Sequence, residues 1–435
     1  MRHPAFRIVM VTTLALTASP LAAQSGNATR AQDSPLEAGL AIAERYRVAA
    51  IAERRFTHDE FWAAVAPSLA SKAFRTESIG RSILGREIRA VTFGSGPVPV
   101  LLWSQMHGDE ATATMALADI FRYLAEAERD PLRERLRRSL TIVFVPMLNP
   151  DGAELFQREN AAGVDVNRDG RRLATPEAQA LKAIRDRIEP RFAFNLHDQS
   201  ARTRVGRTGE QAALALLAPA FDAERSYNDV RTRARLVAAE IATILAPALR
   251  GRLAKYDDTF NPRAFGDLMQ TWGASTVLIE SGALPGDPEK QRLRALHVPA
   301  ILGALDAIAT RRFESADPAV YDSLPFNTGG ASDLVIRGAQ LLLPGRPALR
   351  VDVAVNFEDA VAREDGRIRE IGDLEGAVAI DTVDASGLFL HPRPEALERR
   401  ERQAWLRVGA AAAFDLRRGV DPRSELVRAF GGEGE

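Results

Sequence analysis

The chain of 435 residues contains no cysteine. This absence excludes disulfide bonds, zinc-thiolate sites and a thiol nucleophile, and it leaves His, Asp and Glu as the available metal ligands. An excess of one charge sign is also missing, because 57 Lys and Arg residues stand against 58 Asp and Glu residues, for a net charge of −1. No basic field therefore indicates binding to nucleic acid or to an anionic membrane.

Long apolar runs are missing from the chain after its N-terminal segment. No later segment approaches the ~20 uninterrupted apolar residues of a membrane-spanning helix. At the N-terminus, Arg2 and Arg7 precede the apolar stretch IVMVTTLAL, and TASPLAAQ follows it. This order is typical of a secretory signal peptide, and we predict cleavage near Ala23, which leaves residues 1–23 as the signal. The mature protein is then secreted or periplasmic without a stable membrane span. The alternative is an N-terminal membrane anchor.

Strand-like and helix-like segments alternate through the middle of the chain. Apolar runs with the length of buried strands span residues 86–94, 98–105, 140–149, 190–198 and 274–282. Amphipathic segments that predict helices span residues 110–128, 175–190 and 229–249. Strands buried on both faces and separated by helices indicate an α/β fold. We predict a mixed, mostly parallel central sheet covered by helices on both faces.

The C-terminal part has a different pattern. A stretch rich in Pro, Gly and Ser predicts a connector at residues 316–330, which separates a domain at 24–315 from the rest. Short strand-like segments with turns follow, and they predict a small all-β accessory domain at 331–435. Within that domain, the stretch 395–419 is expected to form a terminal helix.

Four polar side chains follow predicted strands. In SQMHGDEATATM, His107 and Glu110 lie three residues apart at the entrance to a helix, a spacing that lets both bind one divalent metal. His197 follows the strand FAFNL, and Glu280 closes the strand TVLI. Each of these residues taken alone is more simply a solvated or capping residue. Because ligands of such sheets bind beyond the carboxyl ends of the strands, however, we expect the four to converge at one edge, with His197 as third metal ligand.

The motifs HGDE, NPDGAELFQRENAAGVDVNRD, FNLHDQ and TVLIESG occur in an order that resembles the zinc carboxypeptidase (peptidase M14) family. The resemblance extends over about residues 55–310. It implies the fold of that family and a zinc-dependent metallocarboxypeptidase with one Zn²⁺ per chain. Two departures point to a divergent bacterial branch: Asp109 stands where pancreatic-type relatives carry a substrate-binding arginine, and the gap between the metal pair and His197 is shorter.

The resemblance also implies a role for each matching residue. His107, Glu110 and His197 would hold the zinc ion and leave a fourth position open. Glu280 would act as the catalytic base that takes a proton from water and passes it to the leaving nitrogen. Arg158, in LFQRENAAG, would stabilise the oxyanion that forms on the attacked amide.

Other matching residues would bind the substrate, which is expected to be a peptide with a free C-terminal carboxylate. Arg168 would make a bidentate contact to that carboxylate, and Asn167 would add a hydrogen bond. Tyr256 is a candidate for the mobile tyrosine that covers the substrate terminus in family members, with a packing or surface role as the alternative. Asp267 is a candidate for the floor of the side-chain pocket.

Three functional classes stay open. The first is a secreted zinc metallocarboxypeptidase, which the Arg168 anchor favours. The second is a zinc-dependent deacylase or amidase that acts on N-acyl amino acids or cell-wall peptides. The long helices and loops between His197 and Glu280 favour peptide-sized substrates instead. The third is an inactive peptide-binding homologue, which the presence of all three ligands together with Glu280 disfavours.

Overall fold

The computed structural model describes residues 34–401 and 403–431. The predicted signal peptide and its cleavage near Ala23 lie outside these residues. Within the described part of the chain, no helix combines the length and the apolar character that crossing a membrane requires.

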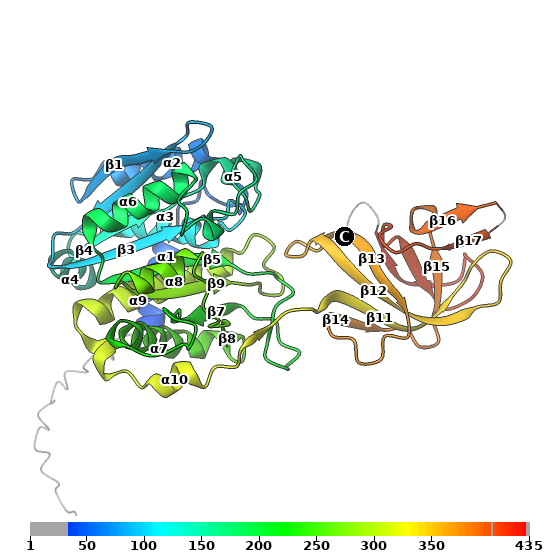
Figure 1. Ribbon diagram of the computed structural model, residues 1–435. Coiled ribbons are helices and arrows are strands. Elements are labelled where there is room, and N and C mark those ends of the chain that lie inside the picture. The colour runs from blue at the N-terminus through cyan, green and yellow to red at the C-terminus, as the bar shows by residue number, and fades with distance from the viewer. Residues whose placement is uncertain (1–33, 402, 432–435) are drawn as a thin grey trace, which may run out of the picture. The chain divides into compact units, whose positions relative to one another are not determined.

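The first part of the chain is built on an eight-stranded sheet with the order β1-β2-β4-β3-β5-β9-β7-β8 (Figure 1). Its strands are β1 (Phe74–Arg81), β2 (Glu87–Phe93), β3 (Val98–Ser104), β4 (Leu140–Val145), β5 (Phe192–Asp198), β7 (Leu214–Leu217), β8 (Leu253–Lys255) and β9 (Ser275–Ser281). The neighbours β4, β3, β5 and β9 run parallel, as do β7 and β8, whereas the other three pairings are antiparallel. The prediction of a mixed, mostly parallel sheet is confirmed.

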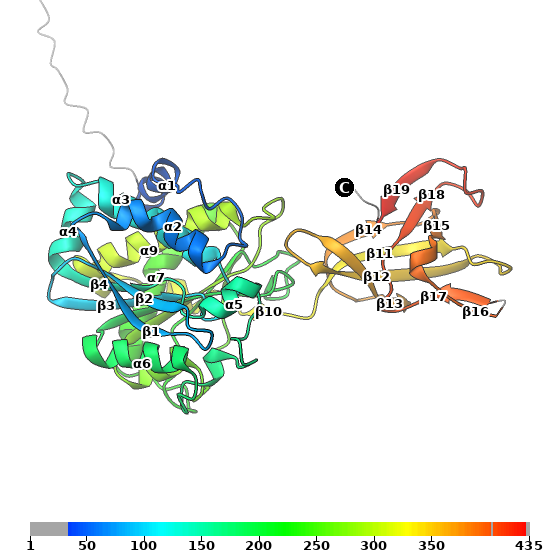
Figure 2. The same cartoon turned by 90° about the horizontal axis from the view of Figure 1, so that it is seen from above.

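Helices cover both faces of this sheet (Figure 2). The helices that bury apolar side chains in the larger core are α1 (Pro35–Arg45), α2 (His58–Leu69), α3 (Thr112–Glu126), α4 (Pro131–Ser139), α7 (Asp229–Leu249) and α9 (Gln291–Ala309). Those that pack on the opposite face are α6 (Pro176–Ile188) and α8 (Phe265–Thr271). Short elements between them are α5 (Pro150–Leu155), η1 (Val166–Arg168), β6 (Arg204–Val205) and η2 (Arg312–Ser315).

An apolar core lies on each face of the sheet, which explains why the sequences of the central strands are unbroken apolar runs. In β3, Val100 and Leu102 point into the core under α3 and α9, whereas Leu101 and Trp103 point into the core under α6 and α8. Since side chains alternate between the faces of a strand, a strand covered on both faces needs apolar residues at every position.

The C-terminal part forms a seven-stranded sheet with the order β13-β12-β11-β15-β18-β19, in which β14 also pairs with β11. These strands are β11 (Ser332–Leu341), β12 (Leu349–Asp359), β13 (Glu364–Gly372), β14 (Ala379–Asp384), β15 (Phe389–Pro392), β18 (Phe414–Arg417) and β19 (Leu426–Phe430). A turn η3 (Pro394–Ala396) leads to a hairpin of β16 (Leu397–Arg400) and β17 (Gln403–Leu406). Separate apolar clusters support this β-rich part, as the sequence predicts.

The predicted terminal helix at 395–419 is wrong, because its residues form η3, β16, β17 and β18. Gly409 adopts φ +86°, which ends any regular helix between β17 and β18. In β18, Phe414 and Leu416 are buried and their neighbours are partly exposed, which is the alternation of a strand. Burial of these side chains outweighs the helix preference of the preceding alanines.

The segment predicted as a connector, 316–330, is partly ordered against the first part of the chain. It contains α10 (Pro318–Asp322) and β10 (Asn327–Thr328). The buried Tyr321 accepts a hydrogen bond from the Ala218 N–H at 3.0 Å, and β10 pairs antiparallel with β6. The segment is therefore not an open linker over most of its length. The division of the chain into domains stays a prediction.

Candidate active site

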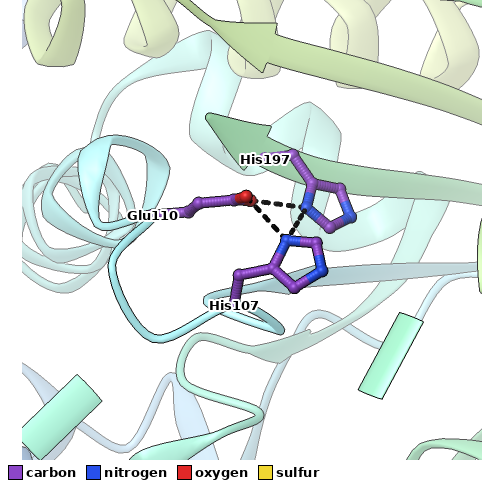
Figure 3. A group of neighbouring side chains, drawn as sticks. All are labelled: His107, Glu110 and His197. Carbon is purple, nitrogen blue, oxygen red and sulfur yellow. Dashed lines mark hydrogen bonds and ion pairs between the residues drawn. The ribbon is translucent and has the colours of Figure 1, made fainter. Parts of the chain in front are cut away.

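Three buried side chains meet at the carboxyl edge of the central sheet (Figure 3). His107 Nδ1 lies 2.6 Å from Glu110 Oε1, His197 Nδ1 lies 2.6 Å from Glu110 Oε2, and the two Nδ1 atoms lie 3.2 Å apart. One ligand atom from each residue lies within 4.8 Å of the others. The predicted convergence of these three residues is confirmed, and their atoms are close enough to share one ion.

The local backbone fixes this arrangement. Because β3 and β5 are parallel neighbours, His107, just beyond β3, and His197, near the end of β5, reach the same edge. Gly108 lies against the NPDG turn so closely that a Cβ atom would fall 1.9 Å from the carbonyl carbon of Gly152. Only glycine therefore fits between the metal-binding turn and the NPDG turn. Glu110 is held from the other side by the Asp198 N–H, which donates to its Oε2 at 3.1 Å.

The donor set fits a catalytic zinc site. Two imidazole nitrogens and one carboxylate are ligands that zinc accepts in such sites, with a further position for water or substrate. Burial lowers the pKa of His107, but the carboxylates of Glu110 and Asp165 outweigh it and raise this pKa to about 9. Burial lowers the pKa of His197. Since a metal binds the neutral imidazole, occupation of the site requires His107 to release a proton.

Asp165 is a site residue that the sequence prediction missed. Its Oδ1 accepts a hydrogen bond from His107 Nε2 at 3.0 Å, which turns Nδ1 towards the other ligands. Its Oδ2 accepts hydrogen bonds from Arg158 Nη2 at 2.9 Å and Nε at 3.2 Å. Asp165 thus joins a metal ligand to the predicted oxyanion-binding arginine. The signal was present in the motif DVNRD, two residues before Asn167.

Glu280 lies on β9 directly opposite His197 in the parallel pairing of β5 and β9. Its side chain is 8% exposed and makes no hydrogen bond with any described residue. Burial, and then the nearby charge of Glu110, raises the pKa of Glu280 well above the usual range of a glutamate. A carboxylate in this setting is suited to accept a proton from water.

The predicted substrate-binding residues Asn167, Arg168 and Tyr256 line the same cavity as the metal-binding cluster. Asn167 accepts a hydrogen bond from the Phe265 N–H through Oδ1 at 2.9 Å, and its amide nitrogen has no partner among the described residues. Arg168 makes no ion pair within that same part of the chain. Tyr256 lies near Glu280, whose charge, together with burial, raises the pKa of the phenol to about 12.

All eight predicted site residues line one cavity of about 730 Å³. They are His107, Glu110, Arg158, Asn167, Arg168, His197, Tyr256 and Glu280. The candidate floor residue Asp267 lines the same cavity. The cavity therefore combines a buried metal-binding cluster with two charged groups that form no ion pair among the described residues, the Glu280 carboxylate and the Arg168 guanidinium, whose Nη1 donates to the Asn167 carbonyl oxygen at 3.0 Å.

Comparison with known proteins agrees with this geometry. Residues 61–200 match the profile of the family Peptidase_M14, zinc carboxypeptidase. Mouse carboxypeptidase M is 32% identical over 141 residues, which cover 28% of this chain and 32% of that protein. Carboxypeptidase SOL1 of Arabidopsis thaliana is 30% identical over 106 residues, which cover 23% of this chain and 22% of that protein. The predicted resemblance to the zinc carboxypeptidase family is thereby confirmed for this part of the chain.

The matches extend over only part of each relative, and the chain spans between a fifth and a third of the length of these curated relatives. They include plant and mammalian as well as fungal proteins. A solved structure of a metallo-carboxypeptidase from Burkholderia cenocepacia aligns with a TM-score of 0.48 and 17% identity, over 59% of this chain and 70% of that one.

Proposed function

We propose that the protein is a secreted zinc metallocarboxypeptidase that hydrolyses the C-terminal peptide bond of peptides. The observation that carries this proposal is the content of one cavity: the cluster of His107, Glu110 and His197, together with the Glu280 carboxylate and the Arg168 guanidinium, neither of which forms an ion pair among the described residues. A metal cluster alone fits many hydrolases. The added cation favours a substrate that carries a negative charge close to the scissile bond.

Different residues of the cavity have different roles in the hydrolysis. Zinc held by the cluster would supply a Lewis acid and bring the pKa of a water molecule towards about 7. Glu280 takes the proton of the attacking water and returns it to the leaving nitrogen, so that the amine leaves neutral. Arg158 lies on the rim of the cluster, with Nη1 3.3 Å from Glu110 Oε1, where its charge stabilises the oxyanion of the attacked amide. Asp165 holds this guanidinium in place from behind.

Three other residues of the cavity orient the substrate. Arg168 and the free amide nitrogen of Asn167 donate hydrogen bonds to the terminal carboxylate, which places the last peptide bond beside the cluster. Tyr256 borders the same space and closes over the bound terminus. Two further proposals follow from the sequence: Asp109 and the short gap before His197 place the protein in a divergent bacterial branch, and cleavage near Ala23 delivers it outside the cytoplasm.

The proposal is tested with pairs of peptides that differ only in a free or an amidated C-terminus. The zinc-loaded wild type is expected to hydrolyse the free acids and to discriminate against the amides, with mass spectrometry showing loss of the last residue. Glu280→Gln keeps the shape and the zinc ligands but cannot accept a proton, so kcat should fall by about 10²- to 10⁴-fold while zinc stays bound. Arg168→Ala should lower kcat/KM for the free acid, through a loss of roughly 2 to 5 kcal/mol of transition-state stabilisation. It should also remove the preference for free acids over amides.

Equal hydrolysis of free and amidated peptides by the wild type would show that Arg168 does not select a terminus. The function would then be that of an amidase or deacylase. Absence of hydrolysis for every peptide, with zinc bound, would favour the inactive peptide-binding homologue.

A further inference from the structure

Asp198, the residue that follows His197, connects two segments that each carry a metal ligand. Glu110 lies in the turn that enters α3, whereas His197 lies near the end of β5 (Figure 3). The Asp198 N–H donates to Glu110 Oε2 at 3.1 Å, and its side-chain Oδ2 accepts a hydrogen bond from Thr112 Oγ1 at 2.6 Å. Since Thr112 is the first residue of α3, Asp198 binds both the ligand and the start of the helix that follows it.

A third contact of Asp198 comes from the segment that follows the strand of Glu280. Lys290 Nζ donates to the same Oδ2 atom at 2.8 Å. Lys290 directly precedes α9, at the end of the loop that connects this helix to β9. The Asp198 carboxylate therefore joins β5, the start of α3 and the loop after β9. Each of these segments adjoins a residue of the active site, namely His197, Glu110 and Glu280.

The ion pair between Asp198 and Lys290 is shielded from water. Their side chains are 8% and 5% exposed. The second carboxylate oxygen, Oδ1, is buried and has no hydrogen-bond partner among the described residues. A buried charge without a partner is costly, so removal of either side chain leaves the other in an unfavourable state. The two side chains are therefore a unit in which each requires the other.

Lys290 occupies a position that the local backbone disfavours for a lysine. Its φ is +50°, in the left-handed region that favours glycine. It also lies at the N-terminus of α9, where the helix dipole is unfavourable for a positive charge. Its burial at this place is thus explained by the contact with Asp198 and not by a local preference. Residues placed against local preference are typical of functional sites.

We propose that Asp198 and Lys290 are a positioning pair that keeps His197 and Glu110 within reach of one metal ion. The inference rests on the proposed zinc site and not on the identity of the substrate. The pair differs from Asp165, which contacts the ring of a ligand, because it fixes the segments that carry the ligands. Ligands that are already in place bind a metal more tightly, since binding does not have to order them.

The experiment measures zinc affinity on the full chain without substrate, by competition with a chromophoric chelator. The proteins are the wild type, Asp198→Asn, Lys290→Met and the double variant, and both substitutions remove a charge with little change of shape. Each single variant should lose about 10- to 100-fold in zinc affinity. The double variant should lose no more than the weaker-binding single variant, because the members of one pair are coupled. Losses that multiply in the double variant would overturn the inference.

The matched control is the buried ion pair of Asp119 and Arg294, whose side chains are 2% and 1% exposed. This pair joins the same two helices, α3 and α9. Within the described chain, the Asp119 carboxylate accepts hydrogen bonds from Val48 and Arg294, and neither is a metal ligand. Asp119→Asn should lower the melting temperature of the zinc-free protein, while its zinc affinity stays within about twofold of the wild type.

Melting curves separate positioning of the ligands from general support of the fold. At one fixed zinc concentration, the rise in melting temperature that zinc causes should be smaller in Asp198→Asn than in the wild type, because this rise depends on the ratio of free zinc to Kd. A lower melting temperature of the zinc-free Asp198→Asn protein, together with an unchanged rise on addition of zinc, would show a merely structural role and overturn the inference.

Thr112→Val tests the same contact if Asp198→Asn does not fold. It removes one donor to Asp198 Oδ2 and keeps the volume and branching of a fully buried side chain. Zinc affinity should fall by about 3- to 10-fold, and an unchanged affinity would overturn the inference. Because each readout is zinc binding, a wild type that binds zinc but cleaves no peptide refutes only the carboxypeptidase proposal. A wild type that binds no zinc overturns the positioning pair together with the metal site.

Discussion

The contact between Asp165 and His107 predicts how metal binding depends on a residue that never touches the metal. Asp165 accepts the Nε2–H of His107 at 3.0 Å and also holds Arg158. Replacing it by Ala removes both contacts, whereas Asp165→Asn keeps a neutral acceptor for His107. The two variants therefore separate the charge of Asp165 from its position.

The structure indicates which contact dominates. His107 is 3% exposed in its side chain and Asp165 20%, so their hydrogen bond is shielded from water. Arg158 is 40% exposed, and an ion pair with such a group contributes roughly 0 to 1 kcal/mol. Loss of a carboxylate that orients a metal-bound histidine typically costs about 10- to 100-fold in metal affinity, or ~1.4 to 2.7 kcal/mol. We expect Asp165→Ala to lower zinc affinity by about 100-fold and Asp165→Asn to lower it by about 10-fold.

Zinc affinity is measured by competition with a chromophoric chelator, and kcat/KM is measured over a range of free zinc. Saturating zinc should restore most of the activity of Asp165→Asn, because its main defect is metal binding. Asp257→Asn serves as the control for a lost surface carboxylate, because Asp257 lines the same cavity but is exposed. If Asp165→Ala binds zinc within about twofold of the wild type, the hydrogen bond does not support the metal site and the reasoning is refuted.

Two further predictions concern the metal and the chain division. His197→Ala should abolish stoichiometric zinc after dialysis, and a retained 1:1 zinc content by metal analysis would disprove the assigned ligands. Limited proteolysis should first cut near Gly329 and Gly330, after β10, and leave a zinc-binding fragment; first cuts within 140–300 would contradict this boundary.

The central sheet was predictable because each of its main strands combines length with an unbroken apolar run. The helix predicted at 229–249 matches α7 residue for residue, and the helix predicted at 175–190 corresponds to α6, which Thr175 caps. These signals are local, so they are readable without knowledge of the partners. Strand order and the antiparallel pairing of β9 with β7 depend on distant contacts, and the sequence pattern does not specify them.

The two segments in which the structure differs from the sequence pattern do so for the same reason. The segment 395–419 has the alanines and charges of a helix, but Phe414 and Leu416 are needed in the core of the β-rich sheet. Likewise, the composition of 316–330 indicates a linker, whereas Tyr321 finds a buried position against α7. In both cases tertiary contacts override a local preference.

The metal ligands were predictable because chemistry restricts them to few residue types at strand ends. Asp165 was missed because its role depends on a contact with a distant residue. It lies in the motif DVNRD, which was interpreted only for Asn167 and Arg168, and only its distance to His107 shows that it supports the metal-binding cluster.

The sheet also determines which side chains of β5 and β9 face the cavity. His197 and Asn195 point to the cavity from β5, while Leu196 between them is fully buried in the opposite core. On β9, Ile279 separates Glu280 from Leu278 in the same way. The buried residues Leu196 and Ile279 fix the direction of these cavity side chains, because a shift of one residue would turn each of them into the core. The apolar pattern of β5 and β9 therefore also positions His197 and Glu280 for their proposed roles.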